Sequence, residues 1–101
     1  MAELISKTYD ISQPKRLKGV LKVRIIDEQQ GLTTLDNVTA IRIHSQNYVL
    51  LIMKDYSPTL GQIDGDVIFL MEDGEKSIRG IRGCFKQQDN EFTMIIEEEK
   101  G

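Results

Sequence analysis

A two-residue alternation of apolar and polar side chains is the feature that most constrains the fold of this 101-residue chain. The segment LKVRIID places Leu21, Val23 and Ile25 on one side and Lys22 and Arg24 on the other. A period of two is that of a β-strand with one buried face. The segment VTAIRIH repeats the pattern, and no stretch has convincing helical periodicity. The chain is therefore predicted to be all-β.

Turn signals separate the expected strands at regular intervals. They are EQQG, SQN, the dipeptide Asp73-Gly74 and QQDNE. Between them, YVLLIM is predicted to be a strand covered on both faces, and GQIDGD a turn that re-enters the sheet. The pattern predicts six or seven short strands over Leu21–Glu97, which is typical of a small β-sandwich or flattened barrel of antiparallel strands. We expect an N-terminal arm or first strand at 1–18, the β-sandwich domain at 19–98 and a tail at 99–101.

Composition narrows the class of protein. Hydrophobic residues make up 40% of the chain, enough for a packed core, and no apolar run approaches the ~20 residues that span a bilayer. We therefore expect no membrane insertion. A single cysteine fits a reducing, cytoplasmic environment. A net charge of −3 and only 6% aromatic residues argue against nucleic-acid binding, although the segment PKRLKGVLKVR is basic and keeps that alternative open.

The residue types that carry chemistry are scarce. His44 is the only histidine, and its strand neighbours predict that it faces outward beside Arg42. Cys84 lies between Gly83 and Phe85, where a small buried side chain is expected. A zinc site needs about four nitrogen or sulfur ligands, and the chain has no phosphate-binding glycine motif. The sequence predicts no catalytic residue, no cofactor, no metal site and hence no enzyme.

From Leu21 to Glu97 the chain resembles the N-terminal β-sandwich of the epsilon subunit of bacterial F-type ATP synthases. The similar segments are LKVRII, DNVTAIRIHSQNYVLLIMKDYSP and GDVIFLMEDGEKSIRGIRGCFKQQDNEFTMII. Tyr56 stands where family members carry a histidine before the proline, here Pro58, and the family's C-terminal helical hairpin is absent. In that family the sandwich docks on the γ subunit and on the ring of c subunits.

The resemblance implies that the turn Lys54 to Leu60 and the strand Gly80 to Phe85 lie near docking surfaces. The residues predicted to bind a partner are Tyr48, Lys54, Asp55, Tyr56, Pro58, Gly80, Gly83 and Phe85. The strand beside Gly80 and Gly83 is expected to be an edge that accepts a partner strand. Two functions fit: a stand-alone, self-associating interaction protein, or a divergent short epsilon subunit that contacts the rotor. A nucleic-acid-binding barrel is a third.

Overall fold

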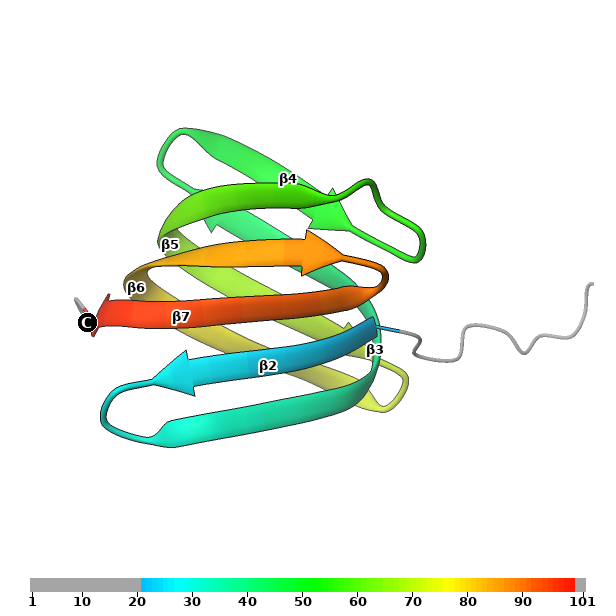
Figure 1. Cartoon of the computed structure of the whole chain (residues 1–101), viewed down its shortest axis with the longest axis horizontal. Helices are drawn as coiled ribbons and strands as arrows, with labels where there is room; N and C mark the ends of the chain where they lie inside the picture. Colours follow the sequence, from blue (N-terminus) through cyan, green and yellow to red (C-terminus); the bar gives the residue numbers. More distant parts are fainter. Residues whose placement is uncertain (1–20, 100–101) are drawn as a thin grey trace, which may run out of the picture.

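The structure is a computed structural model that describes residues 21–99, and these residues form six β-strands (Figure 1). The predicted arm, residues 1–18, lies outside the described residues, and Glu99, assigned to the tail, belongs to the last strand. The strands are β2 (Leu21–Asp27), β3 (Gly31–Ser45), β4 (Tyr48–Ile52), β5 (Thr59–Met71), β6 (Gly74–Gln88) and β7 (Glu91–Glu99).

The sheet closes on itself. Its order is β2-β7-β6-β5-β3-β4, and an additional pairing of β2 with β3 completes a five-stranded barrel with β4 as an extra strand. The predicted fold class, a small all-β sandwich or flattened barrel, is confirmed. Five of the six strand pairs are antiparallel, whereas β2 and β7 run parallel. Hairpin reasoning does not predict that parallel pair, because its strands come from opposite ends of the described chain.

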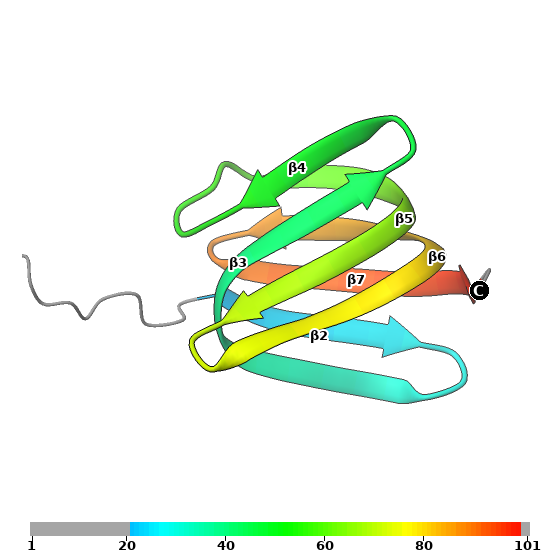
Figure 2. The same ribbon diagram turned by 180° about the vertical axis from the view of Figure 1, so that it is seen from behind.

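The barrel is flattened into two layers because three long strands cross from one layer to the other. The front layer, which faces the viewer in Figure 1, contains β2, β7, the first halves of β3 and β5 and the second half of β6. The back layer, which faces the viewer in Figure 2, contains β4, the second halves of β3 and β5 and the first half of β6. Strands that change layers at bulges are a common way to form such corners.

The bend shared by β5 and β6 is held by Asp66. The register between these strands shifts between Gly65 and Val67, so the ladder is interrupted there. The Gly80 N–H donates to Oδ1 of Asp66 at 3.0 Å, and Arg79 pairs with the other carboxylate oxygen at 3.3 Å. Gly80 has a φ of 67°, a left-handed conformation that glycine adopts without steric cost. The side chain of Asp66 thus replaces a missing ladder partner.

Fifteen apolar side chains fill the space between the layers. Phe92 contacts two other phenylalanines: the ring of Phe69 lies edge-on at 6.1 Å between centroids, and that of Phe85 is stacked at 5.4 Å. Phe69 belongs to the back layer, so this cluster joins the two layers at their centre. The remaining buried members are Leu21, Val23, Ile25, Val38, Ile41, Ile43, Ile52, Ile63, Val67, Ile81, Met94 and Ile96.

Two predictions about the segment from Tyr48 to Asp66 were wrong. The strand YVLLI is not covered on both faces: Val49 and Leu51 are 69% and 46% exposed, while Ile52 is buried. Its sequence is apolar throughout, so alternation gave no signal. The segment GQIDGD is not a turn, because it lies within the strand β5, which continues from Thr59 past both glycines to Met71. Those glycines read as turn signals, yet one of them, Gly65, marks the bulge.

Gln87 provides a test of the core. Its side chain is fully buried, and neither its amide nitrogen nor its amide oxygen has a hydrogen-bond partner among residues 21–99. We expect Gln87→Met to raise the free energy of unfolding by about 1–3 kcal/mol, because an unsatisfied buried amide costs about that much. Urea unfolding measures this, with Gln88→Met as the exposed neighbouring control, expected to change by less than about 0.5 kcal/mol. Equal or lower stability of the Gln87 variant would contradict the interpretation.

Candidate protein-docking surface

The predicted docking turn lies beside the β6–β7 hairpin. Lys54, Asp55 and Pro58 are exposed, and Asp55 has a φ of 63°. The Asp55 N–H donates to Oδ1 of Asn90 at 2.7 Å, and the Asn90 side-chain NH₂ donates back to Asp55 Oδ1 at 3.2 Å. The carbonyl of Asn90 also accepts from the N–H of Lys22 at 3.0 Å. One asparagine therefore connects three segments at this end of the barrel.

The two tyrosines predicted to bind a partner, Tyr48 and Tyr56, are half-buried and pack against the core. The hydroxyl of Tyr48 donates to the carbonyl of Gln62, on the half of β5 that has no strand partner on that side. Burial raises the pKa of the Tyr48 phenol above its ordinary value of 10.0, although a hydrogen bond with Ser45 acts in the opposite direction. The phenol therefore stays protonated at neutral pH. The N–H of Tyr56 donates to the carbonyl of Met53 at 3.1 Å, which closes the turn.

The strand from Gly80 to Phe85 does not offer an open edge, so that prediction was wrong. From Ile81 onward β6 is paired with β5 on one side and with β7 on the other. A Cβ on Gly83 would lie 2.1 Å from the carbonyl oxygen of Ile95, so this glycine permits close strand packing. Phe85 is buried in the core. Of the predicted residues in this strand, none presents a side chain to a partner strand.

An apolar groove, which we call the outer groove, lies on the outer face of the front layer. It has a volume of about 570 Å³ and includes Leu60 and Ile95, which are 75% and 42% exposed. The strand register continues this apolar surface, because Ile95 is paired with Ile26, and Ile26 with Leu32. Ile26 and Leu32 are exposed as well. The other residues that line the groove are Gly61, Gln62, Cys84, Phe85, Lys86 and Thr93.

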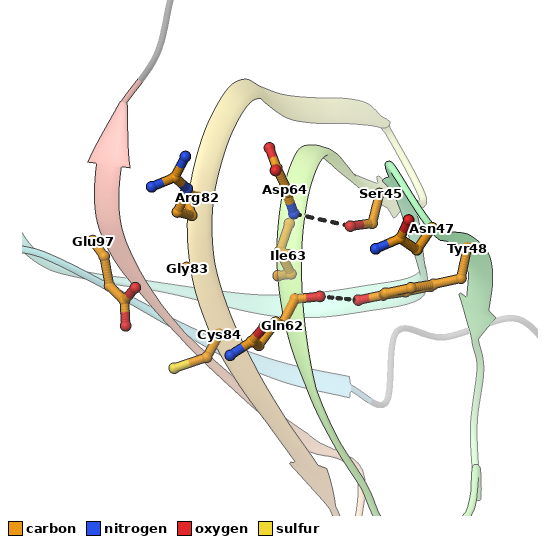
Figure 3. Close-up of a pocket in the computed structure, with 10 residues that line it drawn as sticks. All are labelled: Ser45, Asn47, Tyr48, Gln62, Ile63, Asp64, Arg82, Gly83, Cys84 and Glu97. Atoms are coloured by element: carbon orange, nitrogen blue, oxygen red, sulfur yellow. Dashed lines mark hydrogen bonds between the residues drawn. The ribbon is translucent and has the colours of Figure 1, made fainter.

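A polar hollow adjoins the outer groove and shares Gln62 and Cys84 with it. The hollow has a volume of about 420 Å³ and extends from β7 across β6 and β5 to the β3–β4 turn (Figure 3). The N–H of Asp64 donates to the hydroxyl of Ser45 at 2.9 Å, which fixes the turn against β5. The charged side chains that line the hollow are Asp64, Arg82 and Glu97. Groove and hollow together form one surface, apolar at one end and charged at the other.

The charges beside the apolar residues have opposite signs on the two sides. The strand register places cations on the side toward the β6–β7 hairpin, namely Lys22, Arg24 and Lys86. It places acids on the other side, namely Asp64, Glu97 and Glu98. Some of these charges are paired on the surface, Arg24 with Glu91 at 3.5 Å and Arg82 with Glu98 at 3.0 Å. The surface as a whole still distinguishes an acidic side from a basic side.

Sequence reasoning missed the outer groove. Ile26 and Ile95 occupy the polar phase of their strands, between buried neighbours of the opposite phase. The available signal was an apolar residue at a strand position where the alternation predicts a polar one. In a segment such as TMII, however, such a residue suggests a strand that is buried on both faces. Cys84 was also expected to be buried, whereas it is partly exposed on this surface. The strand pairing was needed to bring Leu60, Cys84 and Ile95 together.

A third cavity, of about 230 Å³, is lined in part by Glu99, the one carboxyl group with a raised pKa among residues 21–99. A hydrogen bond with Asp27 raises the pKa of Glu99 above its ordinary value of 4.5, and the charge of Asp27 and burial act in the same direction. Within residues 21–99 no group of three or more His, Cys, Asp or Glu side chains could hold a metal ion. The described part of the chain also contains no helix long and apolar enough to cross a membrane.

Comparison with solved structures shows the fold. Over 82% of this chain, the structure matches a chain in the central stalk and c-ring of the Tetrahymena thermophila mitochondrial ATP synthase, with a TM-score of 0.61 and 14% identity. Over 93%, it matches a chain in the OSCP, F1 and c-ring structure of the Euglena gracilis mitochondrial ATP synthase, with a TM-score of 0.66 and 15% identity. The match covers 67% of the first chain and 61% of the second. At this identity the likeness concerns the fold.

The comparisons overturn the assignment to the epsilon-subunit sandwich. No family model matches the chain, and no curated protein matches its sequence. One of the structures it resembles is described as a central stalk and c-ring, and the other as an OSCP, F1 and c-ring assembly. The sheet of this chain is a closed five-stranded barrel with one extra strand. The pattern of alternating strands and hairpin turns is shared by many small β-domains, so it did not specify one family.

The contact of Asn90 with the docking turn can be tested with Asn90→Gly. We expect the Asp55 amide to exchange with solvent faster in this variant, because its acceptor is removed. Asp89→Gly is the matched control: Asp89 and Asn90 both have positive φ values, 55° and 63°, which glycine tolerates. Amide exchange followed by NMR distinguishes the variants. The same exchange rate in both would show that Asn90 does not hold the turn.

The Asp27–Glu99 pair predicts a dependence of stability on pH. Because the folded state raises the pKa of Glu99, it binds more protons than the unfolded state at pH values just above 4.5. The contribution of this group to stability therefore falls as pH rises through that window. We expect Glu99→Gln to have a higher urea midpoint than the original chain at pH 7, and the difference to shrink as pH falls below 4.5. A difference that does not vary with pH would contradict this account.

Proposed function

We propose that this chain is a non-catalytic protein-docking module. We further propose that its outer groove receives an amphipathic segment of a protein partner. The observation that carries the proposal is the exposed apolar surface from Leu60 to Ile95, continued by Ile26 and Leu32, with cations on one side and acids on the other. Apolar clusters of this kind on a surface are typical of interaction sites. The charges favour a partner segment with acids opposite Lys86 and cations opposite Glu97.

The placement of the reactive side chains supports a non-catalytic role. His44 is exposed on the outer face of the back layer, where it is paired with Val49 and Asp66. Cys84 lies on the outer face of the front layer, beside Ile95. The two side chains therefore face opposite sides of the barrel and do not form a nucleophile–base pair. The three phenylalanines are buried, which disfavours the stacking of nucleic-acid bases.

The partner class proposed first is a rotor subunit of a rotary ATP synthase. The support is the likeness of the fold to chains in ATP synthase structures that include the c-ring. A location in the reducing cytoplasm fits the single cysteine and stays a prediction. The second candidate, a stand-alone self-associating protein, is favoured by a different observation, the open edge of β4.

Co-purification tests the docking proposal. A tagged chain is recovered from its own cells, and ATP synthase subunits are quantified by mass spectrometry. We expect a rotor subunit to be recovered, and Leu60→Glu with Ile95→Glu to reduce its recovery at least about tenfold, because two charges would enter the apolar contact. Ser77→Glu is the control for each single substitution, since it adds one glutamate at an exposed position of the back layer. Recovery unaffected by the groove variants, or no rotor subunit at all, would refute the corresponding part of the proposal.

A further inference from the structure

The strand β4 has one edge that no described strand covers. The sheet order ends in β4, and its five residues pair only with Ile41–Ser45 of β3. β4 lies at the upper margin of the back layer (Figure 2). The pairing has continuous register from Tyr48 to Ile52, so no bulge twists the edge away. An unpaired row of N–H and C=O groups is a template for another strand.

This edge lacks the protection that the other margins have. Natural sheets blunt exposed edges with charges, prolines, bulges or a covering group. The first half of β6 carries Glu75 and Lys76, and the first half of β3 carries Asp36. The first half of β5 is covered through its Gln62 and Asp64 carbonyls, which accept from the Tyr48 hydroxyl and the Gln46 N–H. The segment YVLLI has no charge and no proline.

We propose that the open edge of β4 pairs with β4 of a second copy of this chain, antiparallel about Leu50, to form a two-fold symmetric dimer. Pairing about Leu50 places Val49 of each copy opposite Leu51 of the other. Both side chains are among the most exposed large apolar residues of the described chain. An uncharged strand is complementary to its own copy in this arrangement, because every side chain then lies opposite another apolar side chain.

The residue that follows β4 also favours a second copy of this chain as the binding partner of the edge. Met53, which follows β4 directly, is 50% exposed and extends the apolar surface beyond the strand. The apolar pairs across the two-fold axis would add a modest contribution to that of the main-chain hydrogen bonds. Such a contact is small, so the dimer is expected to depend on protein concentration. The proposed interface uses β4, whereas the residues that line the outer groove belong to β5, β6 and β7.

Sedimentation velocity of the full chain over about a hundredfold range of concentration tests the dimer. We expect a concentration-dependent shift from monomer to dimer. Val49→Lys and Leu51→Lys should each weaken the association at least about tenfold, because a charge at an edge opposes strand pairing. Ser77→Lys, at an exposed position of the same layer, should leave it unchanged. Urea unfolding confirms that the variants fold. A monomer at all concentrations would overturn the proposal.

Cysteine cross-linking tests the register in a Cys84→Ser background. In the proposed pairing, the double variant Val49→Cys with Leu51→Cys brings unlike positions within disulfide distance and should form a covalent dimer. Val49→Cys alone should not, because the two copies of position 49 are not opposite each other. A dimer that persists in both lysine variants would use another surface and would overturn the proposal. Equal cross-linking by the single variant Val49→Cys would overturn it as well. Failure of the docking proposal can be distinguished from failure of the dimer proposal, because Leu60→Glu and Ile95→Glu leave β4 unchanged.

Discussion

The bend shared by β5 and β6 is the constraint on which the architecture depends. The long strands β3, β5 and β6 each take part in both layers, so that one core is buried between them. At the bend the ladder is interrupted, and a part-buried N–H, that of Gly80, loses its strand partner. The Asp66 carboxylate accepts this hydrogen bond, and a charged acceptor makes it stronger than a neutral one. An amide without a partner would instead oppose the fold.

The same bending produces the candidate docking surface. Because β5 and β6 cross into the front layer, Leu60 and Cys84 reach the outer face that β7 and β2 supply with Ile95 and Ile26. The register between β6 and β7 shifts at Gly83, where the strands pack closely. The groove and the polar hollow meet beside this irregularity, at Gln62 and Cys84. Core packing and surface shape therefore have a common origin in the strand irregularities.

The sequence predicted the fold where one face of a strand is polar. In β2, and in the part of β3 that carries Ile41 and Ile43, alternation identified the buried face correctly. It failed in β4, whose side chains are all apolar, and at Gly65, where a bulge and a turn have the same local signal. The closure of β2 on β7 depends on contacts distant in sequence, which local patterns do not encode. For the same reason the groove could not be predicted, since its residues come from separate strands.

The open edge of β4 is also a consequence of the closure. β2 and β4 lie along the same side of β3: β2 pairs with its first part and β4 with its second, while β5 occupies the opposite side. Because β2 closes the barrel, β4 is left outside the ring, with its inner face on the core through Ile52. No strand among residues 21–99 covers its free edge. A strand that is not needed for closure can serve association without opening the barrel. The two proposed contacts therefore use different strands, docking on β5, β6 and β7 and pairing on β4.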